Sequence, residues 1–187
     1  MKANHVRPHL PKKVFCKDLL TNPATRSVTD VRHTITAVAS SSGSGRAASF
    51  LKDDINCHYA SDVKTYGTYA KLVEDPNVDI IYVATPHSHH FQNVMLALEA
   101  GKHVLCEKAF TVTQAQLKKL VDKAREKGLF LMEAVWTRYF PMSIKIRELV
   151  KENAIGDVHR VTGEFWVHHV LARAVHERKK KSHRSWL

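Results

Sequence analysis

Two short polar segments carry the side chains that are best suited to chemistry, and each directly follows an apolar run. The two segments are Thr85-Pro86-His87, after residues 78–84, and Glu107-Lys108, after residues 103–106. Short, β-branched, almost uncharged runs are typical of strands that are buried on both faces of a parallel sheet. Because open α/β sheets bind ligands at the carboxyl ends of their strands, we predict a binding site at these two segments.

Glu107 and Lys108 support two interpretations. A Glu beside a Lys is often no more than a solvated ion pair on the protein surface. A Lys placed directly after a buried strand can instead hold a substrate hydroxyl or a cofactor ribose through its ammonium group. The position of the pair favours the second interpretation.

Three histidines, His87, His89 and His90, crowd the start of the helix expected from residue 88. They lack the i, i+4 spacing and the accompanying carboxylate of a helical zinc motif, so we predict no metal site. We expect His90 to pack or to hydrogen-bond at the helix start, while His87 faces the cleft.

Trp136 and Arg138 lie just past another apolar run, residues 129–132. An aromatic ring and a guanidinium at this place can line the same cleft. The alternative is that these side chains only pack, in the hydrophobic core or at its edge. This is the preferred interpretation for the neighbouring Tyr139.

The elements that position these residues follow from hydrophobic periodicity and from capping signals. Apolar residues recur at helical spacing after Ser88 and again after Thr113, which forms a capping box with Gln116, and Gly101 and Gly128 end the two helices. We also expect helices at residues 12–20, 47–52, 66–73 and 141–152.

Strands are expected at residues 33–39, 78–84, 103–106 and 129–132, with a brief one near His58 and an extended segment at 157–167. The turn after the first strand is rich in serine and glycine and includes Ser40 and Ser41. The alternation of strands and helices predicts an α/β fold with a doubly wound parallel sheet and helices on both faces.

Composition and charge bear on possible partners and on the cellular compartment. The chain has 187 residues, a formal net charge of +11 and three cysteines. The basic residues are concentrated near the end, in ERKKKSHR, which we interpret as a solvated basic end in preference to a nucleic-acid patch. The widely spaced cysteines and the absence of an apolar leader favour a reducing compartment, the cytoplasm, and no apolar run is long enough to span a membrane.

Three segments in order resemble one known family: ATPHSHHFQNVMLALEAGKHVLCEKAF, LMEAVWTRYFP and AIGDVHRVTGEF. They are similar to the NAD(P)-dependent oxidoreductases of the glucose-fructose oxidoreductase, inositol dehydrogenase and MocA group (Gfo/Idh/MocA), and within it to the branch of dihydrodiol dehydrogenases and NADP-dependent D-xylose dehydrogenases. The resemblance implies a Rossmann domain followed by an α+β domain that binds a sugar or diol and forms a homodimer.

The resemblance also implies roles for single residues. Lys108 matches the lysine of the family's E-K-P element near nicotinamide and substrate, and is the expected catalytic residue. The expected cofactor-binding residues are Thr85, Pro86, His87, His90, Glu107, Lys108, Trp136, Arg138, Ser40 and Ser41. NADP is favoured over NAD as the cofactor.

The chain departs from the family at several places. No glycine-rich turn precedes the helix at residue 12, so the first strand and its phosphate loop are expected to be absent or replaced. Ser41 stands where the branch often has an Arg for the 2′-phosphate, with Arg46 as a weak substitute, and Ala109 replaces the usual proline. The family's D-x-G-x-Y element is not reached by Leu187.

These observations predict an irregular arm at residues 1–11, a Rossmann-like domain at 12–140, the start of a second domain at 141–167 and a basic tail at 168–187. The function expected is hydride transfer between a nicotinamide cofactor and a vicinal diol or sugar, with low activity in this chain. The alternative is an inactive remnant or isoform that acts as a binding or regulatory partner.

Overall fold

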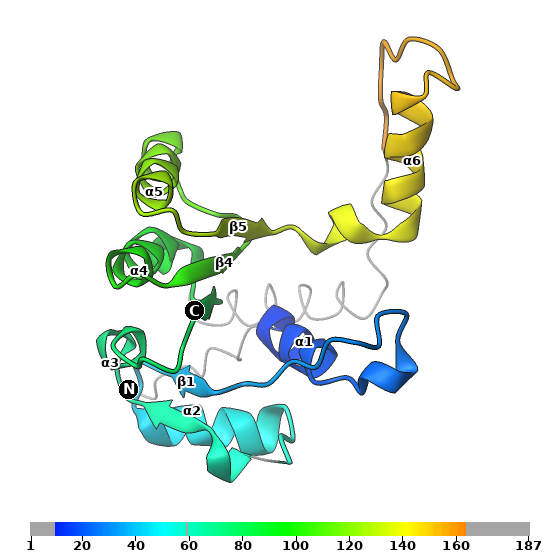
Figure 1. Ribbon diagram of the computed structural model, residues 1–187. Helices are drawn as coiled ribbons and strands as arrows, with labels where there is room; N and C mark the ends of the chain where they lie inside the picture. The colour runs from blue at the N-terminus through cyan, green and yellow to red at the C-terminus, as the bar shows by residue number, and fades with distance from the viewer. Residues whose placement is uncertain (1–9, 59, 164–187) are drawn as a thin grey trace, which may run out of the picture. The chain divides into compact units, whose positions relative to one another are not determined.

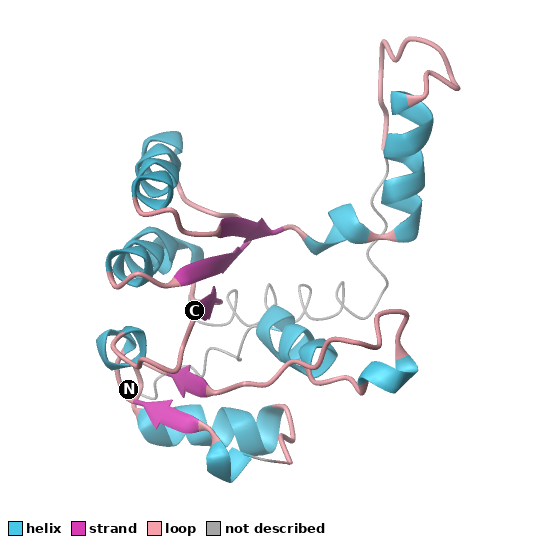
Figure 2. Ribbon diagram, in the orientation of Figure 1, coloured by secondary structure: helices cyan, strands magenta, loops and turns pink. Residues whose placement is uncertain are grey.

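The computed structural model describes residues 10–58 and 60–163, which fall into two compact units, Met1–Trp136 and Thr137–Leu187. The first nine residues of the expected arm and the whole of the expected tail, 168–187, lie outside the described residues. Figure 2 shows that strands and helices alternate along the first unit.

The larger sheet of the first unit contains β3 (Ile80–Val83), β4 (His103–Glu107) and β5 (Leu131–Ala134), all parallel, in the order β3-β4-β5. Its core is fully buried: Val94, Leu98, Val104, Cys106 and Leu120 have no exposed surface. β4 runs through the middle of this core, as expected for a strand with apolar side chains on both faces.

Two long helices complete this half of the unit, α4 (His87–Glu99) and α5 (Gln114–Glu126), which lie side by side in Figure 1. Thr113 caps α5, because its hydroxyl oxygen accepts a hydrogen bond from the backbone N of Gln116 at 3.3 Å. Gly101 and Gly128 follow the two helices with φ of 76° and 62°, the left-handed conformation that glycine adopts without strain. The helix ends predicted from these residues are confirmed.

Over the described part of the chain, the smaller sheet consists of β1 (Ala37–Ala39) and β2 (Lys64–Tyr66), which are also parallel. The helices of this half are α1 (Leu10–Leu19), α2 (Ser44–Ser49), which continues into a π-helical turn at Phe50–Asp54, and α3 (Tyr69–Val73). Its separate core consists of Phe50, Leu51, Ile55, Cys57 and Val63. All three residues of β1 are only half-buried.

Within the described residues, no strand ladder joins the two sheets. Asp75 connects them instead, because its carboxylate accepts hydrogen bonds from Lys64 (3.3 Å) and Tyr66 (2.9 Å) of β2 and from the backbone N of Asn77 (3.0 Å), just before β3. These contacts, led by the backbone bond from Asn77, lower the pKa of Asp75 to about 2.

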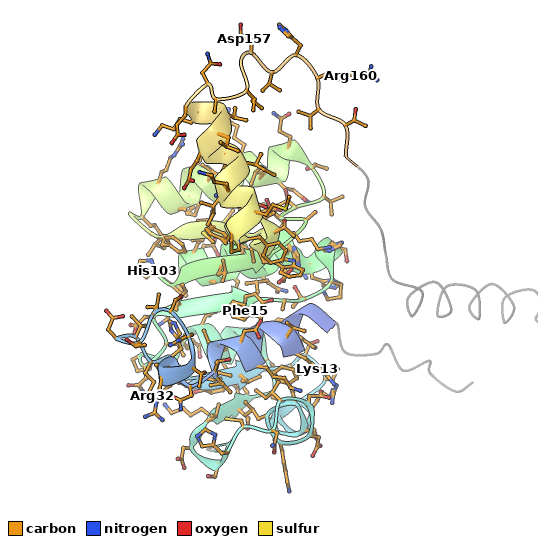
Figure 3. The ribbon with its side chains drawn as sticks, turned by 90° about the vertical axis from the view of Figure 1, so that its right-hand side faces the viewer. Lys13, Phe15, Arg32, His103, Asp157 and Arg160 are labelled. Atoms are coloured by element: carbon orange, nitrogen blue, oxygen red, sulfur yellow. The ribbon has the colours of Figure 1, made fainter. Side chains whose placement is uncertain are left out.

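Helix α1 contacts both halves of the unit. The ring of Phe15 stacks on Tyr82 of β3, with the ring centroids 4.0 Å apart, and Lys13 forms an ion pair with Asp54 of the π-helical turn. Figure 3 marks Lys13 and Phe15 on α1. The helix predicted at residues 12–20 is therefore present, although it begins at Leu10.

Several predicted elements are wrong in place or extent. The strand expected at 33–39 is limited to β1, and the strand expected near His58 is β2, which begins six residues later. Tyr66 belongs to β2, so the helix expected at 66–73 begins at Tyr69, and the strand expected at 129–132 is β5. β2 reads Lys-Thr-Tyr and has no hydrophobic pattern, and the limits of the short strands are determined by which backbone groups pair.

The second unit contains α6 (Pro141–Lys151), with Pro141 in the first turn as predicted. The short 3-10 helix Trp136–Tyr139 precedes it and crosses the boundary between the units. The extended segment expected at 157–167 forms no strand over the part that is described, 157–163.

Candidate functional site

The carboxyl ends of β3 and β4 are held together by side chains of α4. His87 Nε2 lies 2.9 Å from the backbone O of Lys108, and Asn93 Nδ2 donates to the hydroxyl of Thr85 at 3.1 Å. The structure therefore brings Thr85, His87 and Lys108 to one place, as predicted from the two polar segments.

His90 is the central link of this junction. It is fully buried, and its ring nitrogens lie 2.9 Å from two carbonyl oxygens, Nδ1 from that of Ala109 and Nε2 from that of Thr85. Carbonyl oxygens only accept hydrogen bonds, so a neutral ring satisfies one of them and an imidazolium satisfies both. The expectation that His90 hydrogen-bonds at the helix start is confirmed. At this site His90 positions the backbone of Thr85 and Ala109.

The Glu107 carboxylate is held by Tyr82 of β3 and not by the side chain of the neighbouring Lys108. Its carboxylate accepts hydrogen bonds from the Tyr82 hydroxyl at 2.5 Å and from the backbone N of Lys108 at 3.2 Å. Across residues 10–58 and 60–163, no ion pair joins Glu107 to Lys108. Burial, and then the bond to Glu107, raises the pKa of Tyr82. The interpretation as a solvated ion pair is therefore wrong.

The Lys108 side chain is exposed, and the peptide bond to Ala109 is cis. Trp136 lies two residues beyond the end of β5 and is 62% exposed. Arg138 belongs to the second unit, where its backbone O accepts a hydrogen bond from Arg147 at 2.7 Å. That Trp136 and Arg138 share a cleft with Lys108 thus stays a prediction.

A serine-rich turn follows β1. Ser42 donates its backbone N–H to the hydroxyl of Ser40 at 3.2 Å, and the Tyr69 hydroxyl lies 3.5 Å from that of Ser41. Gly43 adopts a φ of 104°, and a side chain built there would meet no atom within 4 Å. The turn is therefore open, with several hydroxyl groups along it.

A cavity of about 710 Å³ connects this turn to the end of β3. Ser40, Ser41, Thr85 and Pro86 all line it, so four of the predicted site residues share one cavity. His87, His90, Glu107 and Lys108 do not line it and form the adjacent junction. The cavity thus spans the carboxyl ends of β1 and β3.

The described walls of the cavity combine apolar side chains with several hydroxyl groups, and the charged side chains among them are Lys12 and Arg46. Burial, and then Arg46, lowers the pKa of Lys12, and burial raises the pKa of the Cys16 thiol to about 11. Arg46 itself lies 3.4 Å from Asp54. None of the described residues that line the cavity is an Asp or Glu, so its interior favours a neutral or anionic ligand.

The described residues fit the adenosine end and the nicotinamide end of a dinucleotide, but not the pyrophosphate between them. The open serine turn and Arg46 suit an adenosine ribose or its 2′-phosphate, and the end of β3 suits the nicotinamide end. The pyrophosphate, however, usually rests on a glycine-rich turn between the first strand and the helix that follows it. Among the described residues no strand or glycine precedes α1, and Gly43, at the start of α2, belongs to the serine turn.

Two positioning residues were missed by sequence reasoning, Asn93 and Tyr82. Tyr82 is the one residue with a polar tip in the apolar run of β3, which is a signal that could have identified it. Asn93 lies eight residues after Thr85, and no local pattern links the two.

Among the residues that the structure describes, no group of three His, Cys, Asp or Glu side chains could hold a metal ion. The helices of that same part of the chain are each too short or too polar to cross a membrane.

Residues 20–135 match the model of a family described as "Oxidoreductase family, NAD-binding Rossmann fold". A relative from Hypocrea jecorina, D-xylose 1-dehydrogenase (NADP(+)), is 67% identical over 153 residues, which are 82% of this chain and 38% of that protein. Trans-1,2-dihydrobenzene-1,2-diol dehydrogenase of Macaca fuscata fuscata is 48% identical over 102 residues, 54% of this chain and 30% of that protein. The chain thus spans less than half of each relative's length.

Solved structures share the fold. An NAD binding oxidoreductase from Klebsiella pneumoniae aligns with a TM-score of 0.62 and 26% identity, covering 75% of this chain and 36% of that one. KijD10, a 3-ketoreductase from Actinomadura kijaniata in complex with TDP-benzene and NADP, aligns with a TM-score of 0.59 and 30% identity, covering 75% and 40%.

Proposed function

Because the chain belongs to the oxidoreductase family with an NAD-binding Rossmann fold, Gfo/Idh/MocA, we propose that its cavity binds the adenosine end of NADP(H) in preference to NAD(H). One observation carries this proposal: the cavity joins the serine turn to the end of β3, and its described lining includes Lys12 and Arg46 but no carboxylate. Rossmann sites for NAD usually place an Asp or Glu on the ribose 2′-hydroxyl, and that carboxylate would repel a 2′-phosphate.

We further propose the roles of the strand-end residues. Ser40, Ser41 and Arg46 contact the adenosine ribose and its 2′-phosphate, while Thr85, Pro86 and His87 lie against the nicotinamide end. A bound nicotinamide supplies the hydride acceptor or donor. Lys108, whose backbone is held by His87 and Glu107, orients a substrate hydroxyl through its ammonium group.

The substrate class follows from the relatives. One relative is named for D-xylose and another for a dihydrodiol, and both molecules carry neighbouring hydroxyl groups. We propose that the substrate is a sugar or a vicinal diol. Trp136 and Arg138 are proposed to contact the same ligands.

Calorimetric titration tests the cofactor proposal. The chain is expected to bind NADPH more tightly than NADH, and Ser41→Asp should weaken NADPH binding by roughly fivefold to tenfold, since unit charges about 4 Å apart interact by about 1 kcal/mol even in water. Ser61→Asp, at an exposed position away from the cavity, is the matched control. Equal affinities for the two cofactors, or no effect of Ser41→Asp, would contradict the preference.

The role of Lys108 is tested by comparing its replacement with the replacement of another exposed lysine, Lys119. Lys108→Met should reduce the rate of D-xylose oxidation with NADP⁺ by about 10²-fold or more, because it removes a group that acts on the reacting hydroxyl. Lys119→Met removes the same charge from an exposed site on α5 and should leave the rate unchanged. Titration of NADPH with both variants shows whether the loss is in chemistry or in binding.

A further inference from the structure

Lys12 of α1 is a half-buried cation that lines the cavity. Across residues 10–58 and 60–163, no carboxylate lies within ion-pair distance of its ammonium group. Its Nζ atom lies 5.5 Å from the centroid of the Phe50 ring, a cation–π contact that offsets only part of the hydration lost on burial. The ammonium group is therefore well suited to bind an anion that enters the cavity.

Asp54 is the carboxylate whose charge acts on Lys12, but two other cations already bind it. Lys13 forms an ion pair with Asp54, and Nη2 of Arg46 lies 3.4 Å from its Oδ2. The hydrogen bond from Lys13 is the largest cause of the lowered pKa of Asp54, so this carboxylate is ionised at neutral pH. The cluster of Lys12, Lys13, Arg46 and Asp54 therefore carries three positive charges and one negative charge.

The excess positive charge lies beside the serine turn. Arg46 belongs to α2, which begins directly after that turn, and Phe50 and Asp54 belong to the π-helical turn that continues α2. Burial, and then the charge of Arg46, lowers the pKa of Lys12, so the two cations that line the cavity repel each other. An anion bound between them would remove this repulsion.

The position of Lys12 on α1 separates it from the end of β3. Phe15 follows Lys12 by three residues, on the same face of the helix, and stacks on Tyr82 of β3. Lys12 instead contacts Phe50, in the core beside the smaller sheet. Lys12 therefore faces the part of the cavity proposed for the adenosine end, and Phe15 faces the larger sheet.

We propose that Lys12 and Arg46 together bind the 2′-phosphate of NADP(H), which makes Lys12 a further determinant of the preference over NAD(H). Lys12 has this role only if the cavity binds the cofactor as proposed above. A phosphate monoester carries nearly two negative charges at neutral pH, and the two side chains supply two positive ones. NAD(H) has a hydroxyl group at this position and gains nothing from either charge.

Calorimetric titration of Lys12→Met with NADPH and with NADH tests the role of the charge, because methionine keeps most of the length and apolar character of the lysine stem. The affinity for NADPH should fall by about tenfold or more, since the variant loses one cation beside a group of nearly two negative charges. The affinity for NADH should change by less than about twofold, because NADH lacks that phosphate.

Two matched variants separate the effect of charge from an effect on structure. Lys17→Met removes the same charge from an exposed position of α1 and should leave both affinities unchanged. Lys12→Arg keeps the positive charge and should retain most of the preference for NADPH. Melting temperatures of all three variants identify a general loss of structure, which would weaken the binding of both cofactors.

Two smaller probes show which phosphate Lys12 contacts. Adenosine 2′-monophosphate carries only the phosphate in question, and adenosine 5′-diphosphate carries only a pyrophosphate. Lys12→Met should weaken binding of the first probe and leave binding of the second unchanged. The opposite result, or an equal loss of NADPH and NADH affinity in a folded variant, would assign Lys12 to the pyrophosphate and overturn the proposal.

An unchanged affinity of Lys12→Met for NADPH would also overturn the proposal. The proposed function would then still stand, provided that the unmodified chain binds NADPH more tightly than NADH. If the unmodified chain bound neither cofactor, or bound both equally, the proposed function and the role of Lys12 would fall together. Titration of the unmodified chain therefore distinguishes the two failures.

Discussion

The two sheets of the first unit differ in how completely their strands are buried. In the larger sheet, β4 has a strand on each side and two long helices beside it, and Val104 and Cys106 are fully buried. In the smaller sheet, β1 has a partner on one side only and none of its three residues is fully buried. The difference shows that burial in a doubly wound sheet depends on neighbouring strands as much as on the apolar character of a segment.

The strongest test of this difference compares two leucines that are both fully buried, Leu98 of α4 and Leu51 of the π-helical turn. Leu98→Ala should lower the free energy of unfolding by about 2–5 kcal/mol, the range for a cavity in a rigid core. Leu51→Ala should cost less, because its core borders the open cavity and its neighbours can relax. Urea denaturation measures both, and equal losses would show that the two cores are equally rigid.

A smaller loss is expected at the junction of β3 and β4. His90→Leu removes both ring nitrogens, so the buried carbonyl that accepts the ring N–H loses its donor, which costs about 1–3 kcal/mol. His89→Leu, at an exposed position on the same helix, should change stability by less than about 0.5 kcal/mol. If His90→Leu were equally silent in urea denaturation, the two ring contacts would not hold the strand ends.

The smallest effect is expected where Asp75 connects the sheets. Its pKa is lowered to about 2 from an ordinary value of 3.8, so the carboxylate stabilises the fold above about pH 4 and this stabilisation is lost as pH falls toward 2. Melting temperatures between pH 5 and pH 2 should therefore fall less steeply for Asp75→Asn than for the unmodified chain. Asp122→Asn, exposed on α5, is the control. Parallel pH profiles would rule out this contribution of Asp75.

The sequence predicted the larger sheet well and the smaller one poorly, for a physical reason. Gly101, Thr113, Gly128 and Pro141 determine helix ends through local backbone geometry, which can be inferred from the residues alone. β2 reads Lys-Thr-Tyr and has no hydrophobic pattern, because its ladder with β1 is made by backbone groups. Its place could not be inferred without the partner strand.

The same distinction applies to the candidate site. Thr85 and Lys108 were predicted to converge because each follows a buried strand, and the structure joins them through α4. The bonds from His90 to Thr85 O and Ala109 O were not predictable in detail, because they join a side chain to backbone carbonyls on two other segments. Side chains that bond backbone leave no spacing rule in the sequence.

The pairing order of the strands has a consequence for folding kinetics. Each ladder of the described residues joins strands that are consecutive in the chain: β1 with β2, β3 with β4, and β4 with β5. β3 is connected to β4, and β4 to β5, by one helix each, while β1 is connected to β2 by α2, its π-helical turn and a short 3-10 helix. These pairings of consecutive strands keep the sequence separation of the contacts short, and low contact order favours rapid folding. Each βαβ segment of the described residues can therefore form as soon as its second strand is available.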